Sequence, residues 1–220
     1  PTMKLNIMFI PIGIPAYIEN DSTAIALVEK HFGKAKNSSP TLVINLTWGV
    51  GLGILIDNKI FKGYKGFAGE FSHIPLADSN KLCLCGKKGC LEVEASLQTA
   101  IDYIEDQLKA GEASILNEQK SQITFEHLIH AYNVGDQLTI EAMKRIGHML
   151  GKGIATLIHI LNPEKIILAG KGTVFGDIIL SEVQSSIHLY CIPKLSDQTK
   201  IELSTLKNVL TLAAASTVIQ

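Results

Sequence analysis

The segment TLVINLTWGVGLGILIDNKIF, residues 41–61, carries the clearest strand pattern in the chain. Apolar and β-branched runs alternate with glycines, and Asp57-Asn58 separates the second run from the third. Such runs predict strands, and a two-residue Asp-Asn connection predicts a tight hairpin turn. We therefore expect three consecutive strands in an antiparallel meander, with the third continuing through NKIFKGYKGF at residues 58–67.

A largely helical region follows the meander. The pattern is helical from Glu92 to about Ala131, with breaks near Gly111 and Asn117. Apolar residues at helical spacing then predict one long helix over residues 137–161, which ends because Asn162-Pro163 cannot continue it.

Three glycines interrupt this long helix: Gly147, Gly151 and Gly153. Each disfavours a helix interior by up to about 1 kcal/mol relative to alanine. We expect another element to pack close to the helix backbone there, most simply a neighbouring helix.

The last quarter of the chain alternates strands with helices. KIILAG at residues 165–170 is followed by a helix over about 177–189, the strand KIELSTL at 200–206 and a final helix over about 209–218. This alternation implies parallel strands joined by right-handed crossovers. A meander followed by this order predicts an α/β fold of the ribonuclease H-like, actin-like ATPase type, with a mixed sheet and flanking helices.

The opening segment is predicted to belong to a different lobe. PAYIEND followed by STAIALVEKHFG, residues 15–33, is typical of one strand and one helix with no earlier partner strand. The polar loop KAKNSSP, residues 34–40, is the best candidate boundary. We expect residues 1–36 to be the tail of an N-terminal lobe and residues 37–220 to form the C-terminal lobe.

Composition excludes several classes of protein. The 220 residues contain 20 basic and 21 acidic side chains, so no strong field attracts these residues to nucleic acid. No apolar run approaches the roughly 18 residues needed to cross a bilayer, and the N-terminal residues lack the features of a signal peptide. We expect a cytoplasmic protein that does not associate with membranes.

A cluster of zinc ligands is expected in the loop of residues 70–92. His73, Cys83, Cys85 and Cys90 supply one imidazole and three thiols, a set that suits tetrahedral zinc. Four protein ligands leave no position for an activated water, so the metal would be structural. The alternative is three reduced, buried cysteines beside an unrelated histidine.

The surrounding residues extend this pattern to a family. GFAGEFSHIPLADSNKLCLCGKKGCLEVEAS, residues 66–96, resembles the signature of the ROK family of sugar kinases and sugar-responsive repressors, which share a two-lobed, actin-like fold. IENDSTAIALVE at 18–29 resembles its sugar-site segment, LTWGVGLGILID at 46–57 its phosphate loop, and LNPEKIILAG at 161–170 a later strand of the nucleotide lobe. The first half of such a protein is not represented, so we expect a piece of a longer chain.

The resemblance implies the sugar-binding residues Asn20, Asp21, Glu70, His73 and Glu92. A metal that folds the loop would thereby also position Glu70, His73 and Glu92. In the family's kinases Asp21 resembles the general base that takes the proton of the attacking sugar hydroxyl. An aspartate at this place is alternatively a helix N-cap, or a sugar ligand without a catalytic role.

The phosphate loop departs from the kinase pattern. A kinase of this family resembles Thr-Leu-Gly-Thr-Gly-Ile-Gly-Gly-Gly, whereas residues 45–53 read NLTWGVGLG, with Trp48 in place of a threonine and Leu52 in place of a glycine. Ser72 and Ala169-Gly170-Lys171 also differ from the usual glycines. We expect a degenerate nucleotide site at Thr47, Trp48, Gly49 and Gly51. The alternative is that Trp48 packs beneath the turn and leaves space for a phosphate.

Two functions from different classes follow from the resemblance. We favour the sugar-sensing, effector-binding and oligomerising region of a transcriptional repressor that is not an enzyme. Its partners would be a sugar or sugar phosphate, DNA through a winged helix outside these residues, and copies of itself in a homodimer or tetramer. The alternative is a glucokinase-like sugar kinase that uses ATP and Mg²⁺. A third possibility is a zinc-stabilised sugar-binding protein that neither binds DNA nor catalyses a reaction. The identity of the sugar, the operator and the sign of the response are not predicted.

Overall fold

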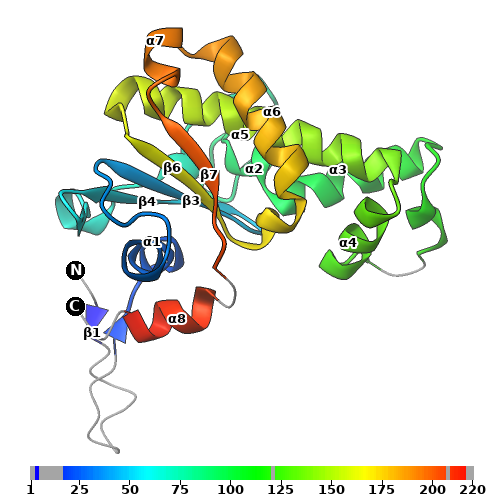
Figure 1. Ribbon diagram of the computed structural model, residues 1–220. Coiled ribbons are helices and arrows are strands. Elements are labelled where there is room, and N and C mark those ends of the chain that lie inside the picture. Colours follow the sequence, from blue (N-terminus) through cyan, green and yellow to red (C-terminus); the bar gives the residue numbers. More distant parts are fainter. Residues whose placement is uncertain (1–2, 5–16, 120–121, 207–208, 217–220) are drawn as a thin grey trace, which may run out of the picture.

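A five-stranded mixed sheet forms the centre of the protein (Figure 1). The computed structural model describes residues 3–4, 17–119, 122–206 and 209–216. The strand order is β5-β4-β3-β6-β7, with β3, β4 and β5 antiparallel and β3, β6 and β7 parallel. The strands are β3 (Thr41–Leu46), β4 (Val50–Ile56), β5 (Lys59–Ile60), β6 (Lys165–Ala169) and β7 (Lys200–Leu203). The predicted α/β class, the meander and the parallel strands are confirmed.

Helices cover both faces of this sheet. Figure 1 shows α5 (Gln137–Leu161) and α6 (Gly176–Tyr190) on one side and α1 (Asp21–Phe32) and α8 (Val209–Ser216) on the other. The remaining α-helices of the described residues are α2 (Glu92–Ala95), α3 (Leu97–Lys109), α4 (Phe125–Asn133) and α7 (Pro193–Ser196). The last helix was expected to reach Val218, and residues 217–218 lie outside the described part of the chain.

Burial on both faces explains why the TLVINL strand is apolar almost throughout. Leu42 and Ile44 of β3 belong to the large core that includes α5 and α6, whereas Val43 packs in a smaller core with Ile25 of α1. All six residues of β3 are buried. Such a central strand needs apolar side chains in both directions; its buried polar exceptions are Thr41, whose hydroxyl donates to the carbonyl oxygen of Ser38, and Asn45.

The turn between β4 and β5 is the predicted hairpin. Asp57 and Asn58 have φ angles of 51° and 57°, the left-handed values that a two-residue turn of this type requires. The expected length of the third strand is wrong, because β5 contains only Lys59 and Ile60. After it the chain turns into a short 3₁₀ helix at Tyr64–Gly66, where Lys65 also has a positive φ of 57°.

The glycines of α5 allow close helix packing, as expected. A Cβ at Gly147 would lie 2.9 Å from Glu182 of α6, and one at Gly151 would lie 2.6 Å from Ser186. Gly153 instead faces Phe71, a core residue within the loop of residues 70–92. The glycine face of α5 is therefore covered within this chain.

The opening segment differs from the expectation in one respect. Met3–Lys4 (β1) pairs antiparallel with Tyr17–Ile18 (β2), so the predicted lack of an earlier partner strand is wrong. Each strand has two residues, too few to produce an alternating pattern in the sequence. Helix α1 follows and packs on β3 and β4. The lobe boundary near residue 36 remains a prediction.

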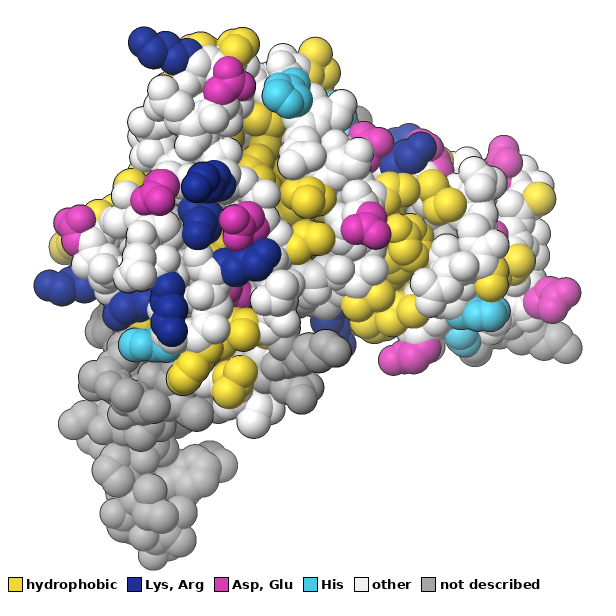
Figure 2. Space-filling model, in the orientation of Figure 1, with side chains coloured by type: hydrophobic (Ala, Val, Ile, Leu, Met, Phe, Trp, Pro, Cys, Tyr) yellow, Lys and Arg dark blue, Asp and Glu magenta, His cyan; other side chains and the backbone are white. Residues whose placement is uncertain are grey.

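The surface carries charges of both signs. Figure 2 shows Lys and Arg side chains interspersed with Asp and Glu on one face. Within the described residues, no helix has the length and hydropathy needed to cross a membrane.

Candidate functional site

The four predicted metal ligands lie together. The ligand atoms of His73, Cys83, Cys85 and Cys90 are all within 4.8 Å of one another. Nδ1 of His73 lies 3.6 Å from Sγ of Cys83, and the Sγ atoms of Cys85 and Cys90 are also 3.6 Å apart. Ligands of a tetrahedral zinc ion, bound at about 2.0–2.3 Å, lie about 3.4–3.8 Å from one another. The donor set and its spacing therefore fit zinc.

The thiol pKa values add a chemical reason for a cation. Burial, with the neighbouring thiols of Cys85 and Cys83, raises the pKa of Cys90 to about 12. The backbone N–H of Lys87 lowers the pKa of the exposed Cys85 thiol. Three thiolates this close repel one another, and a divalent cation compensates their charge.

The shape of the loop is fixed by its backbone and by α5. Gly89 has a φ of +70°, and a Cβ there would lie 2.1 Å from the carbonyl oxygen of Ala77. Lys152 of α5 donates a hydrogen bond of 2.8 Å to the carbonyl oxygen of Leu76. The ligands are thus held between tight turns and a rigid helix.

A polar cavity of about 340 Å³ lies beside this loop and contains most of the predicted sugar residues. Asn20, Asp21, Glu70 and Glu92 line it. His73 is not among the lining residues, but its Nε2 lies 3.8 Å from Oε2 of Glu70. Three of the four predicted nucleotide-site residues, Thr47, Gly49 and Gly51, also line the cavity, whereas Trp48 does not. Residues from separate parts of the sequence therefore form one site. We call this the polar cavity.

The start of α1 positions Asn20 and Asp21. Asn20, not Asp21, is the N-cap, and its Oδ1 accepts hydrogen bonds from the backbone N–H groups of Ser22 and Thr23. Asp21 Oδ1 accepts from Ser22 N at 2.7 Å, and Oδ2 accepts from Asn45 Nδ2 at 3.2 Å. The carboxylate is held in place and remains exposed to the cavity.

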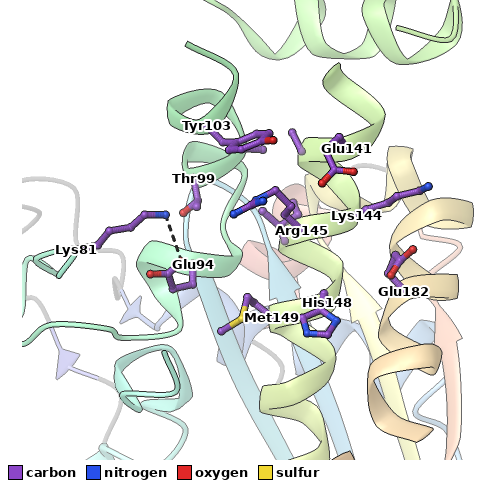
Figure 3. A pocket seen from close by; sticks show the side chains of 13 residues that line it. Lys81, Glu94, Thr99, Tyr103, Glu141, Lys144, Arg145, His148, Met149 and Glu182 are labelled. Carbon is purple, nitrogen blue, oxygen red and sulfur yellow. Dashed lines mark hydrogen bonds and ion pairs between the residues drawn. The ribbon is translucent and has the colours of Figure 1, made fainter. Parts of the chain in front are cut away.

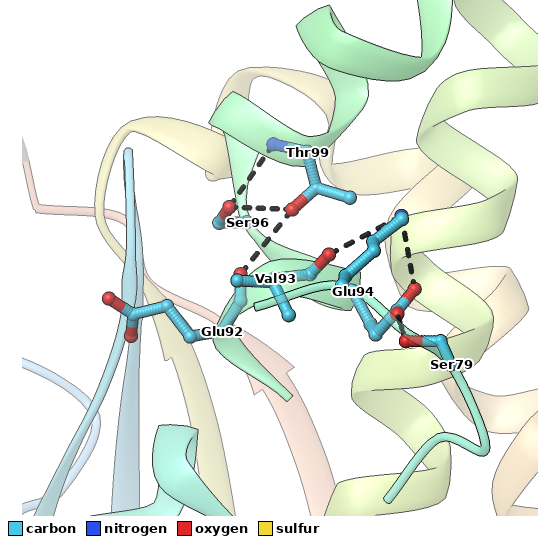
Figure 4. Close-up of polar contacts among 7 residues, drawn as sticks. Ser79, Glu92, Val93, Glu94, Ser96 and Thr99 are labelled. Carbon is cyan, nitrogen blue, oxygen red and sulfur yellow. Dashed lines mark hydrogen bonds and ion pairs between the residues drawn. The ribbon is translucent and has the colours of Figure 1, made fainter. Parts of the chain in front are cut away.

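Helix α2 connects the ligand-bearing loop of residues 70–92 to the polar cavity (Figure 4). Glu92 points to one side, where its carboxylate would contact any side chain added at Gly49. Glu94 points to the other side and accepts hydrogen bonds from Ser79 Oγ at 2.5 Å and Lys81 Nζ at 3.2 Å. One short helix thus carries a cavity residue and an anchor to the loop.

The loop after β3 opens onto a second, larger cavity of about 830 Å³. Trp48 is 41% exposed and packs edge-on against Phe125 of α4, with ring centroids 6.2 Å apart, so it does not lie beneath the turn. Lys171 Nζ lies 5.5 Å from both ring centroids. We call this cavity the aromatic cleft.

A third cavity, of about 500 Å³, lies between α3 and α5 (Figure 3). Arg145 stands over the ring of Tyr103, with 4.5 Å from its guanidinium carbon to the centroid. Glu94, Glu141 and Glu182 face it together with basic side chains, and none of the predicted sugar residues lines it. Lys81, Lys144 and Arg145 balance the three glutamates, so the lining favours neither an anion nor a cation.

Sequence reasoning missed several polar-cavity residues, among them Glu19, Asn45 and Lys62. Lys62 Nζ and Glu19 Oε2 form an ion pair of 2.7 Å. Asn45 is only 2% exposed, and its Oδ1 has no hydrogen-bond partner among the described residues. A polar residue within the apolar run of a buried strand was the available signal for Asn45. The Glu19–Lys62 pair joins residues far apart in the sequence, so no sequence signal pointed to it.

Comparison with known proteins places this geometry in a family. The sequence of residues 10–218 matches the family model of the ROK family. The xylose repressor of Caldicellulosiruptor bescii is 34% identical over 197 residues, which cover 89% of this chain and 49% of the repressor. This chain thus spans about half the length of that relative.

Two solved structures share the fold. A ROK family transcriptional regulator, a homolog of the Escherichia coli MLC protein, matches with a TM-score of 0.83 and 31% identity, over 93% of this chain and 52% of that one. The second structure is a ROK family glucokinase from Streptomyces griseus in complex with glucose and AMPPNP. It matches with a TM-score of 0.84 and 27% identity, and the match covers 94% of this chain and 69% of the glucokinase. Repressors and kinases are thus both among the relatives. The chain belongs to the ROK family and has its actin-like ATPase fold.

Proposed function

We propose that this chain is the effector-binding region of a ROK-type transcriptional repressor that senses a neutral sugar. In the whole protein, DNA binding falls to a winged helix outside these residues, and two or four copies assemble. Zinc at His73, Cys83, Cys85 and Cys90 has a structural role. The observation that carries the proposal is the polar cavity, in which Asn20, Asp21, Glu70 and Glu92 come together beside the zinc loop.

The chemistry of the polar cavity matches a polyol. Sugar hydroxyls donate hydrogen bonds, and carboxylates accept them strongly. The carboxylates of Asp21 in α1, Glu70 in the loop before His73 and Glu92 in α2 come from three separate segments, so hydroxyls on several sides of a ring have acceptors. Asn20 uses its Oδ1 to cap α1, so its Nδ2 is the group left to donate to a sugar oxygen.

The charge of the cavity favours a neutral sugar over a sugar phosphate. Four carboxylates, of Glu19, Asp21, Glu70 and Glu92, surround it, and among the described residues that line it Lys62 is the only lysine or arginine. That lysine is already paired with Glu19. A phosphate would meet net negative charge, and like charges in a partly buried site repel.

Catalysis is disfavoured by the aromatic cleft. Phosphoryl transfer depends on backbone amides and cations that hold the γ-phosphate in place. Here the indole of Trp48 stands beside Phe125, at the position of the loop where the family's kinases resemble threonine. We infer that the loop does not hold ATP for transfer, and that Asp21 acts as a sugar ligand.

A sugar kinase is the second candidate, and one observation favours it. Asp21 is oriented by Asn45 and Ser22 and faces the polar cavity, which is what a general base for a sugar hydroxyl requires. The similar glucokinase from S. griseus binds glucose and AMPPNP. ATP binding and turnover decide between the two candidates.

The test is calorimetry with D-xylose, D-glucose, N-acetyl-D-glucosamine and glucose 6-phosphate, together with an assay of sugar-dependent ATP consumption. We expect one neutral sugar to bind, no binding of the phosphate and no turnover. Asp21→Ala should weaken binding by about 1–3 kcal/mol, while the exposed Asp197→Ala serves as a matched control. Sugar-dependent turnover near 1 per second, lost in Asp21→Ala, would make the protein a kinase.

A further inference from the structure

The four expected zinc ligands differ in their exposure to solvent. Cys83 and Cys90 are buried and His73 is half-buried, whereas Cys85 is exposed. A purely structural zinc site needs no exposed thiolate, and buried structural cysteines are chemically inert. A dissolved oxidant reaches the Cys85 sulfur most easily, so the cluster has one reactive position.

Cys85 lies at the tip of a tight turn that is open to solvent. The backbone N–H of Cys83 donates to the carbonyl oxygen of Lys87 at 2.8 Å, and that of Gly86 donates to the carbonyl oxygen of Cys83 at 2.9 Å. Leu84, beside Cys85, is fully exposed, and a Cβ at Gly86 would meet no atom of the described residues within 4 Å. The base of the turn is therefore fixed, while its tip has free space around it.

A second thiol stands next to Cys85. The Sγ atoms of Cys85 and Cys90 are 3.6 Å apart, and a disulfide requires about 2.05 Å. A shift of about 1.5 Å at the open tip closes this gap. Sγ of Cys83 instead faces Nδ1 of His73, at 3.6 Å. Cys85 and Cys90 are therefore the pair whose geometry favours a disulfide.

We propose that Cys85 and Cys90 form a peroxide-sensitive modification site that controls zinc binding by the loop. In the first step the Cys85 thiolate attacks one oxygen of hydrogen peroxide, the O–O bond breaks, and Cys85 sulfenic acid and hydroxide form. In the second step the Cys90 thiolate attacks the Cys85 sulfur, an S–S bond forms, and the S–O bond breaks to release a second hydroxide. Two thiolates are oxidised to one disulfide, hydrogen peroxide is reduced to two hydroxide ions, and both ions take up protons from the solvent.

The disulfide changes what the loop can hold. His73 and Cys83 remain as ligands, and two are too few for a structural zinc ion, which takes four. The backbone of Cys90 pairs with Pro75, and Cys90 lies two residues before Glu92, which lines the polar cavity. Oxidation should therefore displace Glu92 and weaken sugar binding. This last consequence rests on the proposed function, whereas the disulfide and the release of zinc do not depend on it.

The test treats the zinc-loaded protein with hydrogen peroxide and follows zinc release with the indicator pyridylazoresorcinol. We expect one zinc per chain to be released and the affinity for the sugar to fall by about tenfold or more in calorimetry. Dithiothreitol with added zinc should restore both. Trypsin cleaves after Lys87 and Lys88, between the two cysteines. Mass spectrometry should therefore find residues 82–87 linked to residues 89–109 through Cys85, with the thiol of Cys83 free.

Cys85→His keeps a zinc ligand at the tip of the turn but removes its sulfur. This variant should bind zinc and release it at least about tenfold more slowly in peroxide. Cys191→Ser is the matched control, because Cys191 is buried outside the cluster, and it should respond as the wild type does. Equal rates of zinc release from Cys85→His and the wild type would exclude Cys85 as the reactive residue.

Retention of zinc by the wild type in a large excess of peroxide would overturn the proposal, and so would oxidation to sulfinic acid that dithiothreitol does not reverse. A peptide linked through Cys83 would contradict the assignment to Cys85, and this result comes from the wild type, so it holds even if Cys85→His does not bind zinc. Zinc release without a change in sugar affinity would disprove the link to the polar cavity. If the reduced, zinc-loaded protein binds none of the sugars, the proposed function alone is wrong, because the disulfide and zinc release are measured without a sugar.

Discussion

Nε2 of His73 lies 3.8 Å from a carboxylate oxygen of Glu70, while Nδ1 of the same ring faces the thiol of Cys83 at 3.6 Å. One imidazole therefore stands between the thiol cluster and a residue that lines the polar cavity. A histidine bound to a metal has a fixed ring orientation and tautomer, and its second nitrogen is aimed at a defined partner. Metal content and sugar affinity should therefore change together.

Cys83→Ser tests this coupling. We expect the wild-type protein to carry one zinc per chain and the variant substantially less, measured by elemental analysis after purification without chelators. The affinity for the sugar should fall by about tenfold or more, because Glu70 and Glu92 lose the loop that places them. Cys191→Ser is the control, since Cys191 lies outside the cluster. Full sugar affinity in zinc-free Cys83→Ser would show that the loop does not need the metal.

Glu94→Ala separates positioning by α2 from metal binding. The substitution removes the hydrogen bond from Ser79 and the ion pair with Lys81, but no metal ligand. We expect zinc to remain stoichiometric and sugar affinity to fall about threefold to tenfold, because Glu92 sits on the same short helix. Glu112→Ala, at an exposed position outside this network, should leave both unchanged. Loss of zinc from Glu94→Ala would contradict this division of roles.

Asp136 should make the stability of α5 sensitive to acid. It caps the helix by accepting from Thr139 N and Oγ1, both at 2.8 Å, and from Ile115 N at 3.1 Å. Burial of Asp136 raises its pKa, but the hydrogen bonds from Thr139, Ser114 and Ile115 prevail, so the pKa lies below its usual 3.8. Because the folded-state pKa is depressed, the stabilisation is complete above pH 3.8 and declines as the pH falls towards the folded-state pKa.

Chemical denaturation at pH 7 and at pH 3 measures this effect. Asp136→Ala should lower the free energy of unfolding at pH 7 by about 1–2 kcal/mol, the usual contribution of an N-cap. Asp136→Asn keeps a capping oxygen, so it should lose less at pH 7 and show a weaker dependence on pH. An equal loss of stability on acidification in Asp136→Asn and in the wild type would exclude Asp136 as the source.

The sequence predicted those features that depend on local pattern. The long α5 follows from apolar spacing and ends at Asn162, whose φ of 41° is left-handed, just before Pro163. The zinc cluster follows from ligand types within one loop. The roles of Asn45 and Glu94 could not be predicted in this way, because each depends on a partner, Asp21 or Ser79, that only the folded chain brings near. The family resemblance, not periodicity, supplied the sugar residues.

The close approach of α1 to β4 depends on Gly51. A Cβ at Gly51 would lie 1.9 Å from Ser22 Oγ and 2.9 Å from Ser22 Cβ. Ser22 follows Asp21, so the helix start could not stay in place, and the bond from Asn45 to Asp21 would lengthen. Gly51→Ala should therefore lower the free energy of unfolding by about 1–3 kcal/mol, as overpacking does, and weaken sugar binding.

A second substitution identifies the cause of that loss. Ser22→Gly removes both atoms that the new Cβ would meet, so the double variant Ser22→Gly, Gly51→Ala should regain sugar affinity lost by Gly51→Ala alone. Ser22→Gly by itself should cost about 1 kcal/mol of stability, because glycine is unfavourable inside a helix. Thermal denaturation and calorimetry of the four proteins form a double-mutant cycle, with a coupling of about 0.5–3 kcal/mol expected for residues in contact. If the losses of stability and sugar affinity are additive and the double variant shows no recovery, the effect of Gly51 on the polar cavity does not arise from the close approach of α1 to β4.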